Sequence, residues 1–231
     1  MKRLLCFIFA TICTILLCAC SQTEESKIVN SWDCTVIRSE MTEDYLPTYS
    51  DEIIVSSTGC VTFENESDFD VAIFFYINGI SERAEELAAN SKVVLYGMNK
   101  DAEYTIGVYS SAEAGTEVKL LAHDGIMSLV ESKQGSKKPI LPEKAVTMAQ
   151  KYIKTDEEYV KNFDEPSVAV RVGTENLIVM NTKTREYVSS DEYVGRELYV
   201  ISFETIDANW GAIDVYVDKY KGVVLGTGIV M

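Results

Sequence analysis

Few side chains in this sequence could take part in catalysis, and the first of them is an imidazole. His123 is the only histidine, which excludes a metal site built from several imidazoles. It stands directly before Asp124 and Gly125, which have the composition of a turn. A Ser–His–Asp hydrolase could use it, but the sequence lacks a Gly-x-Ser-x-Gly nucleophile motif. The sequence therefore favours a structural or exposed His123 over a catalytic one.

The remaining polar groups give no stronger indication of catalysis. The carboxylates of Asp156, Glu157 and Glu158 follow one another where a helical turn is expected to begin, which explains them through the helix dipole. The tripeptide Gly226-Thr227-Gly228 resembles part of a dinucleotide-binding motif, but no helix can follow it before residue 231. The sequence predicts no catalytic residue, no metal site and no cofactor, and hence no enzyme.

Cysteine is the next reactive residue type. Four of the six cysteines fall within the first 20 residues, which leaves Cys34 and Cys60 as the remaining thiols. Both lie in segments that look like strands. Outside the cell, where disulfides persist, the two could form one bond. A disulfide between Cys34 and Cys60 is therefore predicted.

The first residues of the chain have the pattern of an export signal. Lys2 and Arg3 precede an apolar run over residues 4–17, which is short for a membrane-spanning helix. The run ends at Leu17-Cys18-Ala19-Cys20, which resembles the lipobox of bacterial lipoproteins. That resemblance implies a signal peptide over residues 1–19, diacylglycerol on Cys20, and a chain anchored on the extracytoplasmic face of the cell membrane. An ordinary signal peptide or an uncleaved anchor is the alternative.

The charge of the chain restricts its partners. There are 36 acidic and 21 basic residues, a net charge of −15, and no basic stripe. An acidic surface repels nucleic acid, so nucleic-acid binding is not expected. The membrane, through the lipid anchor, and an envelope protein or peptide are the expected partners.

The chain pattern predicts two folded regions. Residues 20–30 are polar and read as a tether, and residues 31–130 contain short strand-like runs separated by turns, as in an antiparallel β-sandwich. Within this region, residues 70–77 are expected to form a central strand, whereas residues 81–89 have helical composition. The polar stretch 131–139, with Gly and Pro, predicts a linker.

Residues 140–231 read as one helix followed by an antiparallel meander. The helix is expected over residues 142–153, with a single apolar stripe along one side. The residues that form this stripe are Ala145, Met148, Ala149, Tyr152 and Ile153. The opposing sheet face should come from alternate residues of two later strands: Tyr199, Ile201, Phe203, Ile213, Val215 and Val217. The predicted fold class of the whole chain is therefore α+β.

The same region is similar to a PepSY domain. The similarity rests on the helix from residue 142, the strand Glu197-Leu198-Tyr199-Val200-Ile201, and a closing strand–turn–strand in which Asp218 and Gly222 have the PepSY spacing. The resemblance implies a PepSY-like α+β domain with a noncatalytic interaction role, which in that family includes restraint of a peptidase. Residues 174–196 depart from the pattern as an inserted hairpin.

These features lead to one functional expectation and one alternative. The leading expectation is a membrane-anchored lipoprotein that acts as a noncatalytic protein- or peptide-interaction module. Tyr187 and Tyr193, in the inserted hairpin, are expected to be exposed and are the predicted partner-binding residues, because aromatic residues are enriched at interfaces. The alternative is that both tyrosines pack on the edge of the sheet. The alternative is a surface lipoprotein that binds a small molecule or a glycan in an aromatic pocket.

Overall fold

The computed structural model describes residues 28–39, 47–129, 138–207 and 211–230, and these residues form a β-rich fold. The predicted signal peptide, Cys20, most of the tether and most of the linker lie outside the described residues. Strands account for 49% and helical residues for 11% of the described residues, which contain a single α-helix. The expected α+β class with a separate PepSY-like domain is therefore wrong. Helix α2 covers only one face of strands that belong to a larger sheet.

Two principal antiparallel sheets and one short strand pair make up the fold. The four-stranded sheet has the order β3 (Thr48–Ile54), β8 (Tyr104–Ser110), β5 (Val71–Ile77) and β6 (Ile80–Leu87). The ten-stranded sheet has the order β1 (Ser31–Asp33), β10 (Leu120–Asp124), β4 (Cys60–Asn65), β7 (Lys92–Tyr96), β11 (Ser167–Val172), β14 (Glu197–Glu204), β15 (Ala212–Asp218), β16 (Val223–Val230), β12 (Leu177–Asn181) and β13 (Glu186–Tyr187). The small pair joins β2 (Val36–Ile37) to β9 (Glu117–Val118).

The N-terminal half, residues 28–129, packs the four-stranded sheet against strands β1, β10, β4 and β7. Phe63 of β4 meets Phe75 of β5 edge to face, with ring centroids 5.3 Å apart, and both rings are fully buried. Edge-to-face packing of this kind adds to the burial of apolar surface in holding two sheets together. Interior strand β5 has the position that its apolar sequence predicts.

The segment expected to be helical over residues 81–89 is strand β6. Its Glu and Ala composition favours a helix, but the preceding Asn78 and Gly79 both have positive φ, 52° and 79°. Two consecutive residues with positive φ form the tight hairpin turn that matches the twist of antiparallel strands. The turn returns the chain along β5, from Ile77 opposite Ile80 to Val71 opposite Leu87. Tertiary pairing therefore overrides the local helical preference.

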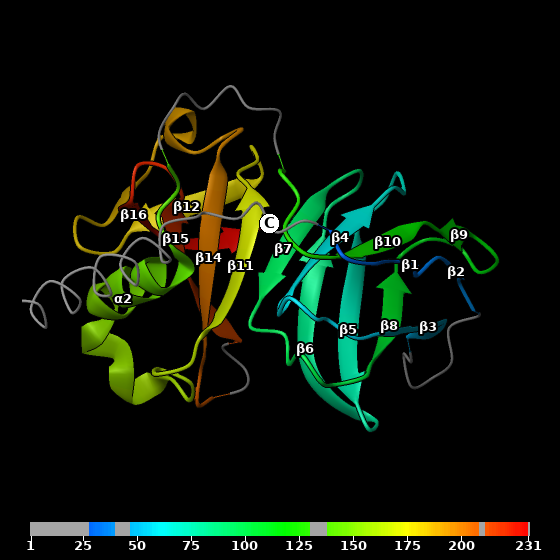
Figure 1. The fold of residues 1–231 in the computed structure, drawn as a ribbon. Coiled ribbons are helices and arrows are strands. Elements are labelled where there is room, and N and C mark those ends of the chain that lie inside the picture. Colours follow the sequence, from blue (N-terminus) through cyan, green and yellow to red (C-terminus); the bar gives the residue numbers. More distant parts are fainter. Residues whose placement is uncertain (1–27, 40–46, 130–137, 208–210, 231) are drawn as a thin grey trace, which may run out of the picture.

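In the C-terminal half, residues 138–230, helix α2 (Pro142–Tyr152) lies against β14, β15 and β16 (Figure 1). It is followed by the 3-10 turns η1 (Lys154–Tyr159) and η2 (Ser190–Glu192). Ala145 and Ala149 of the helix pack on Tyr199, Ile201 and Phe203, as the apolar stripe predicts. None of the described helices is long and apolar enough to cross a membrane.

Strands β7 and β11 join the two halves into one sheet. They pair antiparallel through Val94–Val170, Leu95–Ala169 and Tyr96–Val168. The two regions that the sequence separates into a sandwich and an α+β unit thus share backbone hydrogen bonds, and Figure 1 shows them side by side along this junction.

Leu129, at the end of the N-terminal half, and Ile140, near the start of the C-terminal half, both form hydrogen bonds with the neighbouring residues Glu197 and Lys219. Leu129 N–H donates to Glu197 Oε1 (3.0 Å), and Ile140 N–H donates to the carbonyl of Lys219 (2.9 Å). Glu197 itself accepts from Lys219 Nζ (2.7 Å) and from the Tyr220 hydroxyl (3.0 Å). The chain therefore leaves the N-terminal half and enters the C-terminal half within one buried polar cluster.

A buried carboxylate closes a corner of the N-terminal half. Asp124, only 1% exposed, accepts hydrogen bonds from the hydroxyls of Ser56, Ser57 and Thr58 and from the amides of Ser57 and Thr58. Burial alone would raise the pKa of this carboxyl, but the donors of Ser57, Thr58 and Ser56 outweigh it and lower the pKa to about 2. Asp124 is therefore an ionised, fully hydrogen-bonded structural residue.

Candidate functional site

A cleft of about 610 Å³ lies between the two halves, where the ten-stranded sheet opens. Strand β7 pairs with β4 along its whole length, and β11 pairs with β14 along its whole length. The facing edges of β7 and β11 pair at only three positions, which leaves Lys92 and Val93 of β7 without a partner on β11. A continued register would place Val93 opposite Arg171 and Lys92 opposite Val172, but these pairs are not formed. All four of these residues line the cleft.

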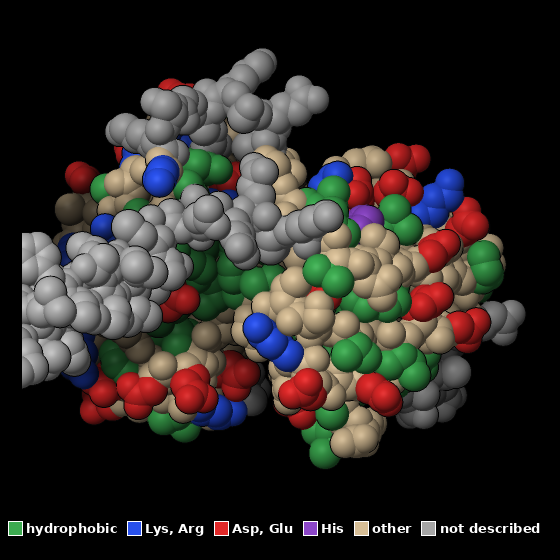
Figure 2. Space-filling view, in the orientation of Figure 1, with side chains coloured by type: hydrophobic (Ala, Val, Ile, Leu, Met, Phe, Trp, Pro, Cys, Tyr) green, Lys and Arg blue, Asp and Glu red, His purple; other side chains and the backbone are tan. Residues whose placement is uncertain are grey.

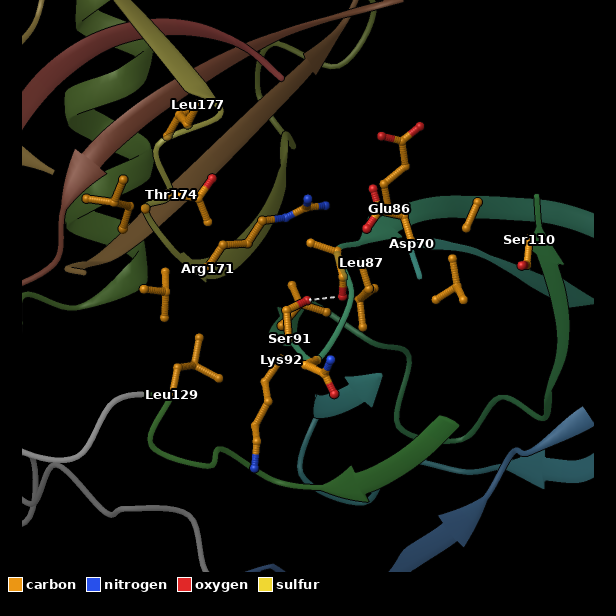
Figure 3. Close-up of a pocket in the computed structure, with 18 of the residues that line it drawn as sticks. Asp70, Glu86, Leu87, Ser91, Lys92, Ser110, Leu129, Arg171, Thr174 and Leu177 are labelled. Atoms are coloured by element: carbon orange, nitrogen blue, oxygen red, sulfur yellow. Dashed lines mark hydrogen bonds between the residues drawn. The ribbon is translucent and has the colours of Figure 1, made fainter. Parts of the chain in front are cut away.

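The other walls come from further strands of both sheets, which are β5, β6, β8, β12, β14 and β15. Asp70, Glu86 and Ser110 stand at one end of the four-stranded sheet, and Thr174 and Leu177 follow β11 (Figure 3). Apolar side chains line much of the interior: Val71, Leu87, Leu129, Leu177 and Leu198. A mixed lining of this kind, at a boundary between packed units, is typical of binding sites.

Arg171 crosses the cleft from β11 toward β6 (Figure 3). Its Nη2 donates to Glu85 Oε2, while Arg83 donates from Nε to the other oxygen of the same carboxylate, 2.7 Å away. Burial would raise the pKa of Glu85, but the charges of Arg83 and Arg171 outweigh burial and hold it below its usual value. Two arginines thus share one carboxylate, and the three groups together carry one net positive charge.

The same arginine has a donor without an acceptor. Within the described part of the chain, Arg171 Nε is the only buried side-chain nitrogen or oxygen without a hydrogen-bond partner. A buried donor without a partner destabilises the fold by roughly 1–3 kcal/mol, and by more when the group is charged. Such an atom in a binding-sized cleft is a position where a ligand oxygen would be stabilised.

Asp214 and Tyr216 of β15 lie on the same side of the sheet as Arg171. Burial raises the pKa of the Asp214 carboxyl, and the hydrogen bond from Ser202 and the charge of Arg171 only partly oppose this effect. Burial likewise raises the pKa of Tyr216, which lines the cleft as a neutral phenol. A Cβ on Gly228 would stand 2.3 Å from the Tyr216 ring, so this glycine makes room for the ring. The Gly-Thr-Gly tripeptide therefore has a packing role.

The structure does not bring the two predicted disulfide partners together. Cys34 and Cys60 are free thiols. Cys34 N–H donates to Leu120 O, whereas Cys60 O accepts from Gly125 N–H, five residues further along the chain, or about 16 Å at strand spacing. A disulfide requires Cα atoms within about 7 Å. Burial raises the pKa of Cys34 to about 12 and of Cys60 to about 11, so neither thiol is readily ionised.

Of the two predicted partner-binding tyrosines, only one is on the surface. Tyr187, at the edge strand β13, is 76% exposed. Tyr193 is 4% exposed, packs into the core and donates its hydroxyl hydrogen bond to Leu177 O. The expectation of an exposed Tyr193 is wrong, because the segment that carries it folds back over β12.

His123 lies on β10 beside a serine and a glutamate. Its Nδ1 is 2.8 Å from Ser31 Oγ, and its Nε2 is 4.0 Å from Glu64 Oε2. The Glu64 carboxylate is bound more closely by Lys92, at 2.6 Å. His123 does not line the cleft, and the carboxylates of residues 156–158 lie in the exposed or half-exposed turn η1.

Sequence reasoning missed the cleft because its lining comes from separate segments. One signal was available: Arg171 stands in the run Ser167-Val168-Ala169-Val170-Arg171-Val172, where an arginine between apolar strand residues requires a buried partner. On the face shown in Figure 2, acidic side chains outnumber basic ones, in agreement with the net charge of −15.

Comparisons with known proteins identify no family. No family model matches the chain, and no curated protein matches it. One solved structure, an acetyl xylan esterase from the rumen bacterium Butyrivibrio proteoclasticus, aligns at 16% identity with a TM-score of 0.25. The alignment covers 47% of this chain and 35% of the esterase. A similarity this low carries no argument about fold or activity.

Proposed function

We propose that this chain is a noncatalytic binding module that captures a peptide or protein segment in the cleft between β7 and β11. The observation that carries the proposal is the cleft itself, which combines a volume of about 610 Å³ with a buried Arg171 Nε that has no acceptor. A segment bound there would cover apolar side chains and supply the missing oxygen.

Capture of a small molecule or glycan in the same cleft is the second candidate. The observation that favours it is the volume, which falls within the range of about 300–1,000 Å³ typical of small-molecule sites. The two candidates differ in the chemical nature of the bound species, so one crosslinking experiment can separate them.

The experiment places the photoreactive residue p-benzoylphenylalanine at Thr174, an exposed position on the cleft wall. The matched control carries the same residue at Glu113, which is exposed and does not line the cleft. After irradiation of intact cells, mass spectrometry of the purified protein should show peptide adducts at Thr174 and none at Glu113. A small-molecule adduct would support the second candidate, and equal labelling at both positions would contradict both candidates.

We also propose that the module works on the outer face of the cell membrane, held by a lipid on Cys20. The support is the Leu17-Cys18-Ala19-Cys20 motif after a charged and apolar leader. A diacyl group supplies two chains, enough for stable anchoring. Cys20→Ser should move the protein from the detergent phase to the aqueous phase of a phase-partition experiment. Full retention of the variant in the detergent phase would contradict lipid anchoring.

A further inference from the structure

We infer that the free edge of β6 is an interaction surface, on which an extended basic peptide adds as a fifth strand to the four-stranded sheet and reaches into the cleft. This inference rests on the proposed function and specifies where and in what form the peptide is held. It combines two independent observations. Strand β6 has no partner on its outer side, and its exposed charged residues, Glu82 and Glu86, are acidic.

Strand β6 ends the four-stranded sheet and pairs with β5 alone. Residues 83–87 pair one to one with residues 71–75 of β5, and alternate residues of such a stretch direct their N–H and C=O groups away from the partner strand. The other described edge strands offer less, because β1, β2, β9 and β13 have two or three residues each and β3 has a register shift at its centre. The β6 edge is therefore the best template for an added strand among the described residues.

The β6 edge lies over the junction between the two halves. Arg83 of β6 donates from Nη1 to the carbonyl of Tyr96 (3.2 Å) and from Nη2 to the carbonyl of Val168 (3.3 Å). Tyr96 and Val168 form one of the three pairs of the β7–β11 junction. The four-stranded sheet therefore ends where the ten-stranded sheet continues into the C-terminal half, as Figure 1 shows. A strand added beside β6 would extend the smaller sheet over β11 and continue the packing of one sheet on the other.

One end of the β6 edge leads into the cleft. Glu86 and Leu87, the last two residues of β6, line the cleft together with Leu198 of β14 and Tyr216 of β15 (Figure 3). A strand that follows β6 would therefore bring its own end between the two halves. Successive side chains of a strand point to opposite sides, so the residues that face the ten-stranded sheet should be apolar.

The exposed charges of β6 determine the charge of the ligand. Glu82 and Glu86 are exposed, and neither forms an ion pair with a described residue. Opposite charges on neighbouring strands stabilise the pair, whereas like charges destabilise it. Two copies of this chain that paired through β6 would bring these carboxylates together, but lysine or arginine residues of a peptide would neutralise them. The expected ligand therefore alternates basic with apolar residues, and the same carboxylates disfavour self-association.

The test begins with a phage-displayed library of random peptides, selected against the mature chain, and fluorescence polarisation measures the affinity of a selected peptide. Glu82→Lys/Glu86→Lys should weaken binding about tenfold. The matched control is Asp51→Lys/Glu52→Lys, at exposed positions of β3 on the opposite edge of the same sheet, and it should leave the affinity unchanged. Both variants change the net charge equally. Equal weakening would therefore show nonspecific attraction to an acidic chain and contradict binding at the β6 edge.

Hydrogen exchange tests the strand geometry independently of charge. An added strand forms hydrogen bonds with the outward amides of β6, so amide exchange over residues 83–87 should slow when the peptide binds. Exchange in β3 should stay unchanged. On the peptide, N-methylation of single amides should abolish binding at alternate positions and be tolerated between them. If the peptide binds without slowing exchange in β6, the strand mode is wrong.

Thr174→Trp separates failure of this inference from failure of the proposed function. Thr174 is exposed on the cleft wall and lies outside β6, so tryptophan there should fill the cleft, leave the β6 edge intact and keep the melting temperature of wild type. It should weaken peptide binding, because the end of the added strand can no longer enter. If Thr174→Trp weakens binding but Glu82→Lys/Glu86→Lys does not, the cleft captures peptides and the β6 edge is not involved. If neither variant weakens binding, or no peptide is selected, both the inference and peptide capture in the cleft are contradicted.

Discussion

Asp124, at the corner of the N-terminal half, and Asp214, on β15 near Arg171, have carboxyl groups with opposite pKa shifts. Asp124 receives five hydrogen bonds from residues 56–58, and its pKa falls to about 2. Asp214 has Ser202 as its hydrogen-bonding neighbour and Arg171 as a nearby charge, and burial raises its pKa. Burial acts in the same direction on both groups, so the number of donors decides the outcome.

The two places differ in how completely their buried polar groups are hydrogen-bonded. Both oxygens of the Asp124 carboxylate accept hydrogen bonds, which is consistent with a structural role. Around Arg171, by contrast, two arginines share the Glu85 carboxylate, Arg171 Nε has no acceptor, and the donor and the charge beside Asp214 only partly oppose its burial. The one buried side-chain donor without a partner in the described part of the chain therefore lies on a residue that lines the cleft, whereas the Asp124 carboxylate is fully hydrogen-bonded.

Of the substitutions that test this difference, Glu85→Gln is expected to change the free energy of unfolding most. Loss of the carboxylate leaves the Arg83 and Arg171 charges close together without compensation, which should lower the free energy of unfolding by about 3 kcal/mol. Urea unfolding at neutral pH measures the change. The control is Glu86→Gln, an exposed neighbour on the same strand, which should change stability by less than about 0.5 kcal/mol. Equal stability of the two variants would show that the arginines need no shared anion.

Asp124→Asn should have the next largest effect, and it should depend on pH. Because the folded-state pKa of Asp124 is about 2 against an ordinary 3.8, its contribution of roughly 2 kcal/mol is complete above pH 4 and is lost as the pH falls toward 2. The variant should therefore be less stable than wild type at pH 6, with the difference shrinking by pH 2. A difference that is constant over this range would contradict an ionised Asp124.

Asp214→Asn should change the free energy of unfolding by less than Asp124→Asn does, and in the opposite direction. A raised folded-state pKa means that the fold favours the protonated carboxyl, so this stabilisation is present below pH 3.8 and is lost as the pH rises through the folded-state pKa. An amide stays neutral, so the variant should gain stability at pH 7, by about 1 kcal/mol or less, and gain nothing in acid. Destabilisation at pH 7 would show that the ionised carboxylate is well paired.

The smallest effect on stability is expected at Tyr187, which is outside both sites. Its side chain is 76% exposed, so Tyr187→Ala should change the free energy of unfolding by less than about 0.5 kcal/mol. The comparison variant is Tyr193→Ala, which empties a buried position and should destabilise by about 3 kcal/mol. Weaker partner capture by the folded Tyr187→Ala protein would extend the binding surface from the cleft to the β13 edge.

The sequence predicts local elements better than their assembly. Strand β5 begins one residue later than predicted and α2 ends one residue earlier, because apolar periodicity and turn residues are local signals. Strand β6 is the exception, since its Glu-rich composition hides a strand that only the Asn78-Gly79 turn indicates. The pairing of β7 with β11 joins residues more than 70 positions apart, and a single sequence contains no signal for such a partner. The cleft depends on that pairing, and therefore could not be predicted.

The anchoring of Leu129 and Ile140 at the Glu197–Lys219 cluster has a consequence for the integrity of the molecule. The chain on either side of residues 130–137 is fixed by hydrogen bonds, and the halves also share the β7–β11 junction. The covalent connection is therefore not what holds the halves together. In this respect the protein is equivalent to a heterodimer whose two subunits are encoded as one polypeptide, and two separately expressed halves should reassemble with the cleft at their interface.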